Sequence, residues 1–231
     1  MTTIADKLQQ VRTRIDAACK ACGRDPTNVR LLAVSKTFPE AALRAAHAAG
    51  QTAFGENYVQ EGVAKIEALA DLRERGGIEW HCIGPLQSNK TRVVAEHFDW
   101  VHSVDRLKIA QRLSEQRPAH LPPLQLCLQV NVDGGANKSG VPPPEALALA
   151  RQVVELPNVR LRGLMAIPEP AEGFEEQRAL FLRATALHEE LRAAGIALDV
   201  LSLGMSADLE AAVAAGSTMV RVGTAIFGGR G

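Results

Sequence analysis

Apolar side chains recur three or four residues apart along the start of the chain: Ile4, Leu8, Val11 and Ile15. Thr3 and Asp6 stand at the spacing of a capping box, in which each residue satisfies a free backbone N–H of the first turn. We therefore predict a helix over residues 3–22. We expect it to end at Gly23, because glycine adopts the left-handed backbone of a helix C-terminus.

Beyond this helix, short apolar runs alternate with longer amphipathic segments. The short runs are predicted strands: 30–35, 52–55, 79–83, 99–103, 124–132, 160–167, 198–203 and 217–222. The segments between them are predicted helices: 39–49, 57–75, 88–97, 105–116, 143–155, 173–194 and 207–215. Strands that alternate with helices form parallel sheets with right-handed crossovers.

The count of strands favours an α/β fold in which a single (β/α)8 TIM barrel follows an extra N-terminal helix. An open doubly wound sheet would need a glycine-rich turn after its first strand, and the residues at 36–39 are Lys-Thr-Phe-Pro. No stretch is long or biased enough to be a linker. We therefore expect one domain over residues 1–231.

Charge and composition exclude several classes of protein. The 26 basic and 26 acidic side chains among 231 residues balance, whereas nucleic-acid and membrane-surface proteins carry a basic excess. No apolar run is long enough to span a membrane, and the first residues lack the pattern of a signal peptide. These features predict a cytoplasmic protein with neither nucleic acid nor membrane as partner, and a monomer is our default expectation.

The cysteines and histidines give little sign of metal chemistry. Cys19 and Cys22 have C-x-x-C spacing, but no second Cys or His pair follows at the distance of a zinc site. Both lie on the predicted first helix, where we expect them to pack in the core. The six histidines show no metal-ligand spacing, and for His81 and His102 on strands we expect a hydrogen-bonded core role. We predict no metal site.

Lys36 differs from the other lysines, most of which lie on predicted helices where a solvated ammonium is ordinary. It follows residues 31–35, an apolar run typical of a strand buried on both faces. Burial lowers the pKa of a lysine, and the neutral amine is the form that makes a Schiff base with a carbonyl ligand. A lysine that reaches water or pairs with a carboxylate is an equal alternative at this point.

Two loops change that balance. Ser206 follows the predicted seventh strand, and Gly223 and Thr224 follow the eighth. Small residues, hydroxyls and free backbone N–H groups hold phosphate, and barrels commonly bind phosphate with these two loops. Either loop alone is also explained by helix caps and turns. Together, and beside the strand that ends at Lys36, they predict a phosphate near a reactive amine, which indicates pyridoxal phosphate.

Other strand ends offer further candidates. Arg221, at the end of the eighth strand, could donate to the pyridine nitrogen of the cofactor, or it could hold a carboxylate such as Glu56 or Asp208. Asn57 is a candidate cofactor contact after the second strand, where Glu56 would pair with a base. For Lys90 and Lys138, which lie in loops, a solvated charge and an amine at the cavity both stay open.

Several segments together resemble the pyridoxal-phosphate homeostasis protein family. They are LLAVSKT at 31–37, FGENYVQE at 54–61, HCIGPLQSNK at 81–90, NKSG at 137–140, GLMAIP at 163–168 and the run 203–228. The resemblance implies a fold like the barrel domain of alanine racemases, with pyridoxal phosphate on Lys36. It places phosphate contacts at Ser206, Gly223 and Thr224, and Arg221 opposite the pyridine nitrogen.

The resemblance also implies a function in vitamin B6 balance. Family members bind and supply pyridoxal phosphate without an accepted catalytic reaction, so we expect a carrier, store or supplier, with apo pyridoxal-phosphate enzymes as candidate recipients. Position 38 is a departure, because Phe38 stands where some relatives have a second lysine.

Two enzyme classes compete with this interpretation. A pyridoxal-phosphate-dependent amino-acid racemase needs a second acid or base opposite the lysine, usually a tyrosine from another domain, and the single tyrosine here is Tyr58 within the barrel. A class I aldolase usually places its lysine near the sixth strand, and residues 163–167 contain none. We expect no catalytic residues, and the racemase is the stronger alternative.

Overall fold

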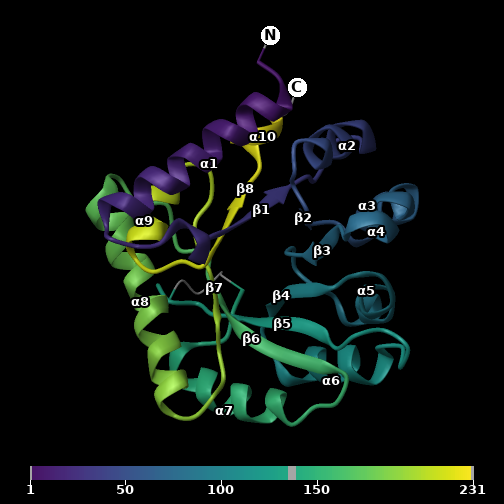
Figure 1. Cartoon of the computed structure of the whole chain (residues 1–231). Helices are drawn as coiled ribbons and strands as arrows, with labels where there is room; N and C mark the ends of the chain where they lie inside the picture. The colour runs from purple at the N-terminus through teal and green to yellow at the C-terminus, as the bar shows by residue number, and fades with distance from the viewer. Residues whose placement is uncertain (1, 135–138, 230–231) are drawn as a thin grey trace.

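The computed structural model describes residues 2–134 and 139–229, in which eight parallel strands close into a barrel with helices around it (Figure 1). The strands follow one another in sequence order, and the first pairs with the last. The predicted (β/α)8 barrel is therefore confirmed. The strands are β1 (Arg30–Val34), β2 (Ala53–Glu56), β3 (Glu79–Cys82), β4 (Trp100–Val104), β5 (Leu124–Gln129), β6 (Val159–Met165), β7 (Val200–Ser202) and β8 (Met219–Val222).

The helices cover the outer face of the barrel. The α-helices are α1 (Ile4–Ala21), α2 (Glu40–Ala48), α3 (Val59–Ala68), α4 (Ala70–Gly76), α5 (Thr91–His97), α6 (Leu107–Gln116), α7 (Pro143–Val154), α8 (Phe174–Ala193), α9 (Leu209–Ala214) and α10 (Thr224–Phe227). Short 3-10 turns, η1 (Pro26–Asn28) and η2 (Ser88–Lys90), precede β1 and α5. None of the described helices is both long and apolar enough to cross a membrane.

Some predicted boundaries were wrong. The single helix predicted over 57–75 is broken at Leu69, whose φ of −112° leaves the helical range and whose side chain is fully buried. The predicted strand 124–132 ends at Gln129, and the next residue, Val130, forms only an isolated bridge to Val141. The helix α10 was not predicted, because four residues are too few to show a helical period.

The barrel interior has its own small apolar core, made by inward-facing strand residues: Leu32, Ala53, Trp100, Cys127, Met165, Val200 and Met219. A larger core fills the space between the strands and the surrounding helices. At Gly163 a Cβ atom would lie 1.6 Å from the carbonyl oxygen of Val200, so only glycine lets β6 approach β7 this closely.

The extra N-terminal helix packs along the outer side of the barrel, where it contacts α2, α9 and α10 (Figure 1). The predicted capping box of Thr3 and Asp6 is present at its start. Arg14 pairs with Glu210 at 2.8 Å and donates to the carbonyl oxygen of Ser206 at 3.0 Å. The helix α1 therefore fixes one of the two loops that the sequence assigns to phosphate.

The two cysteines of α1 have different environments. Cys19 is fully buried, as predicted. Cys22 is exposed, so the expectation of core packing was wrong for it, because Cys22 is the C-cap where the chain leaves the helix toward Gly23. Within residues 2–134 and 139–229, no three His, Cys, Asp or Glu side chains gather as a metal site would require.

Candidate functional site

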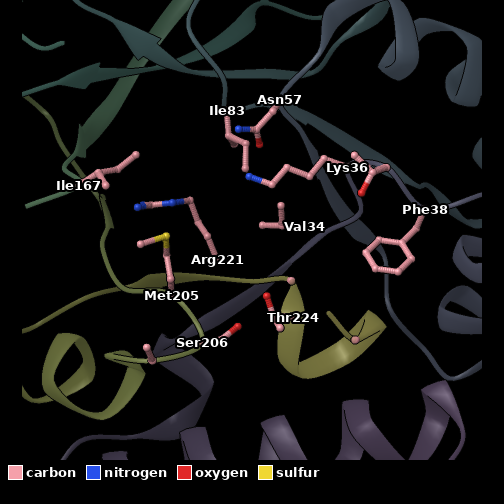
Figure 2. Close-up of a pocket in the computed structure, with 14 residues that line it drawn as sticks. Val34, Lys36, Phe38, Asn57, Ile83, Ile167, Met205, Ser206, Arg221 and Thr224 are labelled. Atoms are coloured by element: carbon pink, nitrogen blue, oxygen red, sulfur yellow. The ribbon is translucent and has the colours of Figure 1, made fainter. Parts of the chain in front are cut away.

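A cavity of about 390 Å³ opens at the C-terminal ends of the strands (Figure 2). Its lining includes every residue that the sequence predicted as a cofactor contact: Lys36, Asn57, Ser206, Arg221, Gly223 and Thr224. These residues come from the ends of β1, β2, β7 and β8, which closure of the barrel brings together. The structure therefore places the predicted site residues around one space.

Lys36 follows β1 by two residues, and its amine points into the cavity, near Asn57 and facing Arg221 (Figure 2). The preceding Ser35 is fully buried, but the Lys36 side chain is only half-buried, so the deep burial that the apolar run suggested was wrong. Lys36 makes no ion pair with the described residues, which removes the alternative of a carboxylate partner there. A half-buried amine without a partner remains available to a ligand.

Close to Lys36 lies a group of polar and charged side chains, which we name the Lys65 cluster: the buried Ser35, Glu56 and Lys65 and the partly exposed Glu61. The Lys65 ammonium donates to the Ser35 carbonyl oxygen at 2.7 Å, to Glu56 at 2.8 Å and to Glu61 at 2.6 Å. Burial raises the pKa of Glu56 despite the neighbouring ammonium. The expectation that Glu56 pairs with a base is confirmed.

The Lys65 cluster also holds the backbone next to Lys36. Thr37 has a φ of 67°, a left-handed conformation that a β-branched residue rarely adopts, and its N–H donates to Glu61 at 2.5 Å. The sequence did not identify Lys65, which has the pattern of an ordinary solvated lysine on a helix. The only signal was its spacing of four residues from Glu61, which predicts an ion pair but not burial.

Asn57 brings a polar atom that lacks a partner. Its Oδ1 is buried and accepts no hydrogen bond in the described structure. Its backbone is tightly enclosed, because a Cβ on Gly84 would lie 2.1 Å from the Asn57 carbonyl oxygen. Buried polar atoms are rarely left unsatisfied, so Asn57 Oδ1 is a candidate ligand contact on a backbone that its neighbours hold in place.

The loops after β7 and β8 meet at the lower side of the cavity in Figure 2. The hydroxyls of Ser206 and Thr224 turn toward the same space, and Ser206 Oγ accepts from the N–H of Ala225 at 3.4 Å. A Cβ on Gly223 would lie 3.0 Å from the Val34 carbonyl oxygen, so this position favours glycine. The arrangement of hydroxyls and close backbone is the one expected for an anion.

Arg221 is buried, and its guanidinium points into the cavity (Figure 2). Nη1 donates to Ser202 O at 2.6 Å and Ser202 Oγ at 2.8 Å, and Nη2 donates to Ala166 O at 3.1 Å. No bond to Glu56 or Asp208 appears among its contacts in the described structure, so the carboxylate alternative was wrong. Burial lowers its pKa to about 10, which leaves the guanidinium charged at neutral pH.

Apolar side chains complete the walls. Ile83, Ile167 and Met205 face the cavity, and Phe38 lines it while stacking on Phe227 with ring centroids 5.1 Å apart (Figure 2). Phe38 therefore contributes an aromatic wall to the cavity. The sequence did not assign these wall residues, because an apolar residue in a loop has no pattern that distinguishes a cavity from the core.

The remaining candidates lie elsewhere. Lys90 belongs to η2 and does not line the cavity, and Lys138 lies outside the described residues. Tyr58 is 53% exposed and is not among the described cavity-lining residues. His81 and His102 are fully buried and hydrogen-bonded to each other, which confirms the predicted core role.

Comparison with known proteins agrees with this geometry. A family model for the N-terminal domain of alanine racemase matches residues 7–231. A pyridoxal phosphate homeostasis protein of Pseudomonas aeruginosa is 61% identical over 100% of this chain and 97% of its own length. One of Escherichia coli is 55% identical, over 100% of this chain and 98% of its own. This chain belongs to the pyridoxal phosphate homeostasis protein family.

A solved structure extends the comparison. PipY of Synechococcus elongatus, solved with pyridoxal phosphate bound, is 41% identical, has a TM-score of 0.83, and is matched over 98% of this chain and 100% of that one. The family resemblance found in the sequence segments is therefore confirmed. The relatives of this family carry the name of homeostasis proteins rather than of enzymes.

Proposed function

We propose that this protein binds pyridoxal phosphate through a Schiff base to Lys36. It would act in pyridoxal phosphate homeostasis as a carrier, store or supplier. The observation that carries the proposal is a single cavity lined by all six predicted residues, with the Lys36 amine directed into it. The cofactor-bound relative supports the same assignment. We further propose one binding domain, a cytoplasmic monomer, and no catalysed reaction.

The cavity offers the groups that such a cofactor needs. The Lys36 amine would form the covalent link, and the bound group would supply an aldehyde held in reversible form. The hydroxyls of Ser206 and Thr224, with the backbone at Gly223, would hold the phosphate. Asn57 would contribute the buried Oδ1, which has no hydrogen-bond partner among the described residues, so the residues present fit the cofactor.

Arg221 would face the pyridine nitrogen. Its bonds to Ser202 and Ala166 occupy both hydrogens of Nη1 and one of Nη2, leaving Nε–H and one Nη2 hydrogen for the cavity. A guanidinium does not readily give up a proton, so it would donate a hydrogen bond and leave the ring nitrogen unprotonated. This arrangement weakens the electron demand of the ring, which favours holding and release over carbanion chemistry.

The proposal is tested by adding pyridoxal phosphate to the purified protein and recording the absorbance spectrum. We expect a visible band that disappears on borohydride reduction, with the reduced adduct found on Lys36 by peptide mass spectrometry. Lys36→Ala should abolish both signals, and the matched variant Lys90→Ala should retain them, because Lys90 lies outside the cavity. A colourless protein, or an equal adduct in Lys36→Ala, would overturn the proposal.

A second assay separates homeostasis from racemisation. The racemase alternative requires a base opposite Lys36, and Tyr58 is exposed outside the cavity lining. We expect no exchange of the α-hydrogen of alanine or serine in heavy water at enzymatic rates, and we expect the loaded protein to activate an apo pyridoxal-phosphate enzyme. Rapid exchange would instead establish an enzyme.

A further inference from the structure

A continuous line of hydrogen bonds runs from Arg221 through the middle of the barrel to its opposite end. Arg221 Nη1 lies 2.8 Å from Ser202 Oγ, and that oxygen lies 3.1 Å from His102 Nδ1. His102 Nε2 lies 2.9 Å from His81 Nδ1, and His81 Nε2 lies 2.8 Å from Glu79. We name Ser202, His102, His81 and Glu79 the axial relay.

The relay ends where β1 and β3 begin. Glu79 is the first residue of β3 and pairs at 2.7 Å with Arg30, the first residue of β1, and both side chains are partly exposed. Ser202 and the two histidines are buried completely. The line therefore joins the cavity at the C-terminal ends of the strands to the surface at their N-terminal ends.

The charges at the two ends, together with neutral rings at both histidines, fix the direction of every bond between them. His81 and Arg30 lower the pKa of Glu79 to about 2 against the opposing effect of burial, so Glu79 is a carboxylate and can only accept. His81 must then donate from Nε2, and its Nδ1 accepts from the Nε2–H of His102. His102 Nδ1 in turn accepts from the Ser202 hydroxyl, whose oxygen accepts from Arg221.

Burial favours this neutral form of both histidines, because burial lowers the pKa of each. The ring nitrogens of both histidines and the Ser202 hydroxyl are then all satisfied, with one hydrogen per bond. The neighbouring Ser103 is a contrast, since its Oγ is buried and has no partner in the described structure. Chains of hydrogen bonds that point one way polarise each other, so a carboxylate at one end strengthens donation at the other.

We propose that the axial relay positions Arg221, locking its Nη1 into the barrel wall so that its remaining N–H groups face the cavity. The two histidines, each neutral and protonated on Nε2, transmit this constraint from Glu79. A ligand bound at Arg221 therefore changes the hydrogen bonding, and with it the resonances, of His102. The last statement rests on the proposed function, because it needs a ligand at Arg221, whereas the tautomers do not.

The first test uses the unmodified protein without ligand. Nitrogen NMR of labelled histidine distinguishes the two neutral tautomers and the charged ring. We expect His81 and His102 both to be neutral at pH 7, with hydrogen on Nε2 and none on Nδ1. An Nδ1–H tautomer or a charged ring at either position would overturn the relay, whatever the protein binds.

The second test compares two buried serines, with pyridoxal phosphate labelled at the ring nitrogen as the probe. Adding it to the wild type should shift the His102 resonances. Ser202→Ala should abolish that shift and move the ring-nitrogen resonance, and Ser202→Thr, which keeps the hydroxyl, should restore both. Ser103→Ala should behave as the wild type. Equal spectra for Ser202→Ala and Ser103→Ala would overturn the positioning role.

The two proposals fail in different ways. If the wild type takes up no pyridoxal phosphate, the proposed function fails while the tautomer test still decides the existence of the relay. If pyridoxal phosphate binds Lys36 and the His102 resonances do not move, the proposed function stands and the coupling through the relay is wrong.

Discussion

Two buried polar networks support the cavity, and they are built in opposite ways. The Lys65 cluster beneath Lys36 buries an ammonium between two carboxylates. The axial relay beneath Arg221 places neutral side chains in the interior and keeps the carboxylate Glu79 at the partly exposed end. The first network holds charged groups in the interior, whereas the second joins neutral interior groups by hydrogen bonds.

The difference corresponds to what each network holds. The Lys65 cluster forms hydrogen bonds to the backbone, since Lys65 donates to the Ser35 carbonyl oxygen and Glu61 accepts from the N–H of Thr37. It therefore stabilises the unusual chain path beside Lys36. The axial relay instead holds a side chain, since Ser202 accepts a hydrogen bond from Arg221. A strained backbone needs strong charged partners, whereas a side chain in a barrel wall needs only correctly directed ones.

The largest effect is expected when the charge balance of the Lys65 cluster is broken. Lys65→Met leaves Glu56 fully buried beside Glu61 without a cation, and removing one partner of a buried ion pair costs about 3–5 kcal/mol. The free energy of unfolding, measured by urea denaturation, should fall by that amount. Adding Glu56→Gln to Lys65→Met should recover part of the loss, because the buried charge is then gone.

An exposed pair supplies the control for this prediction. Arg44 pairs with Asp71 at 2.9 Å, but both side chains are more than 40% exposed, so solvent already screens them. Arg44→Met should lower the free energy of unfolding far less than Lys65→Met. Losses of equal size would mean that burial of charge is not what distinguishes the Lys65 cluster.

The pH dependence of stability should separate the two networks by sign. The folded protein holds the pKa of His81 and His102 below the ordinary value of 6.5, so below about pH 6.5 the unfolded chain binds more protons and stability falls. The slope should approach about 1.4 kcal/mol per pH unit for each histidine. Glu79, whose pKa is about 2 when folded, adds a further loss as the pH falls below 4.5.

The Lys65 cluster should act in the opposite direction. Glu56 has a raised pKa when folded, so the folded protein takes up its proton first and acidification is favourable at this site.

The contribution of the axial relay can be measured by urea denaturation between pH 7 and 5. The free energy of unfolding should fall less steeply with falling pH for His102→Leu than for the wild type. A variant of the exposed His120, His120→Ala, should keep the wild-type slope. An unchanged slope in His102→Leu would contradict neutral burial of the relay.

The two networks also mark how far sequence alone could predict this molecule. The strands, their order and the residues at their ends followed from periodicity, and barrel closure then brought Lys36, Ser206 and Thr224 together. Motif resemblance supplied the proposed role of Arg221 toward the pyridine nitrogen. These residues were predictable because a parallel barrel gathers its strand ends whatever the details of packing.

The supporting residues depend on contacts across the barrel. Lys65 has the sequence pattern of a solvated helical lysine, yet it is buried against the ends of β1 and β2. His81, His102 and Ser202 were placed on strands, and the core role of the histidines was expected. Their connection depends on β3, β4 and β7 facing one another at matching heights, which no local pattern records.

The smallest expected effect concerns the backbone at Thr37, which the Lys65 cluster helps to hold. Thr37 has a φ of 67°, where glycine is about 1 kcal/mol better than a residue with a Cβ. Thr37→Gly should therefore be more stable than Thr37→Ala by about that amount in urea denaturation. At the exposed Thr52, which lacks a positive φ, Ala should be the more stable, as at most positions. The same order at both sites would mean that the Lys36 loop stores no backbone strain, and the Lys65 cluster would then differ from the axial relay in its charge alone.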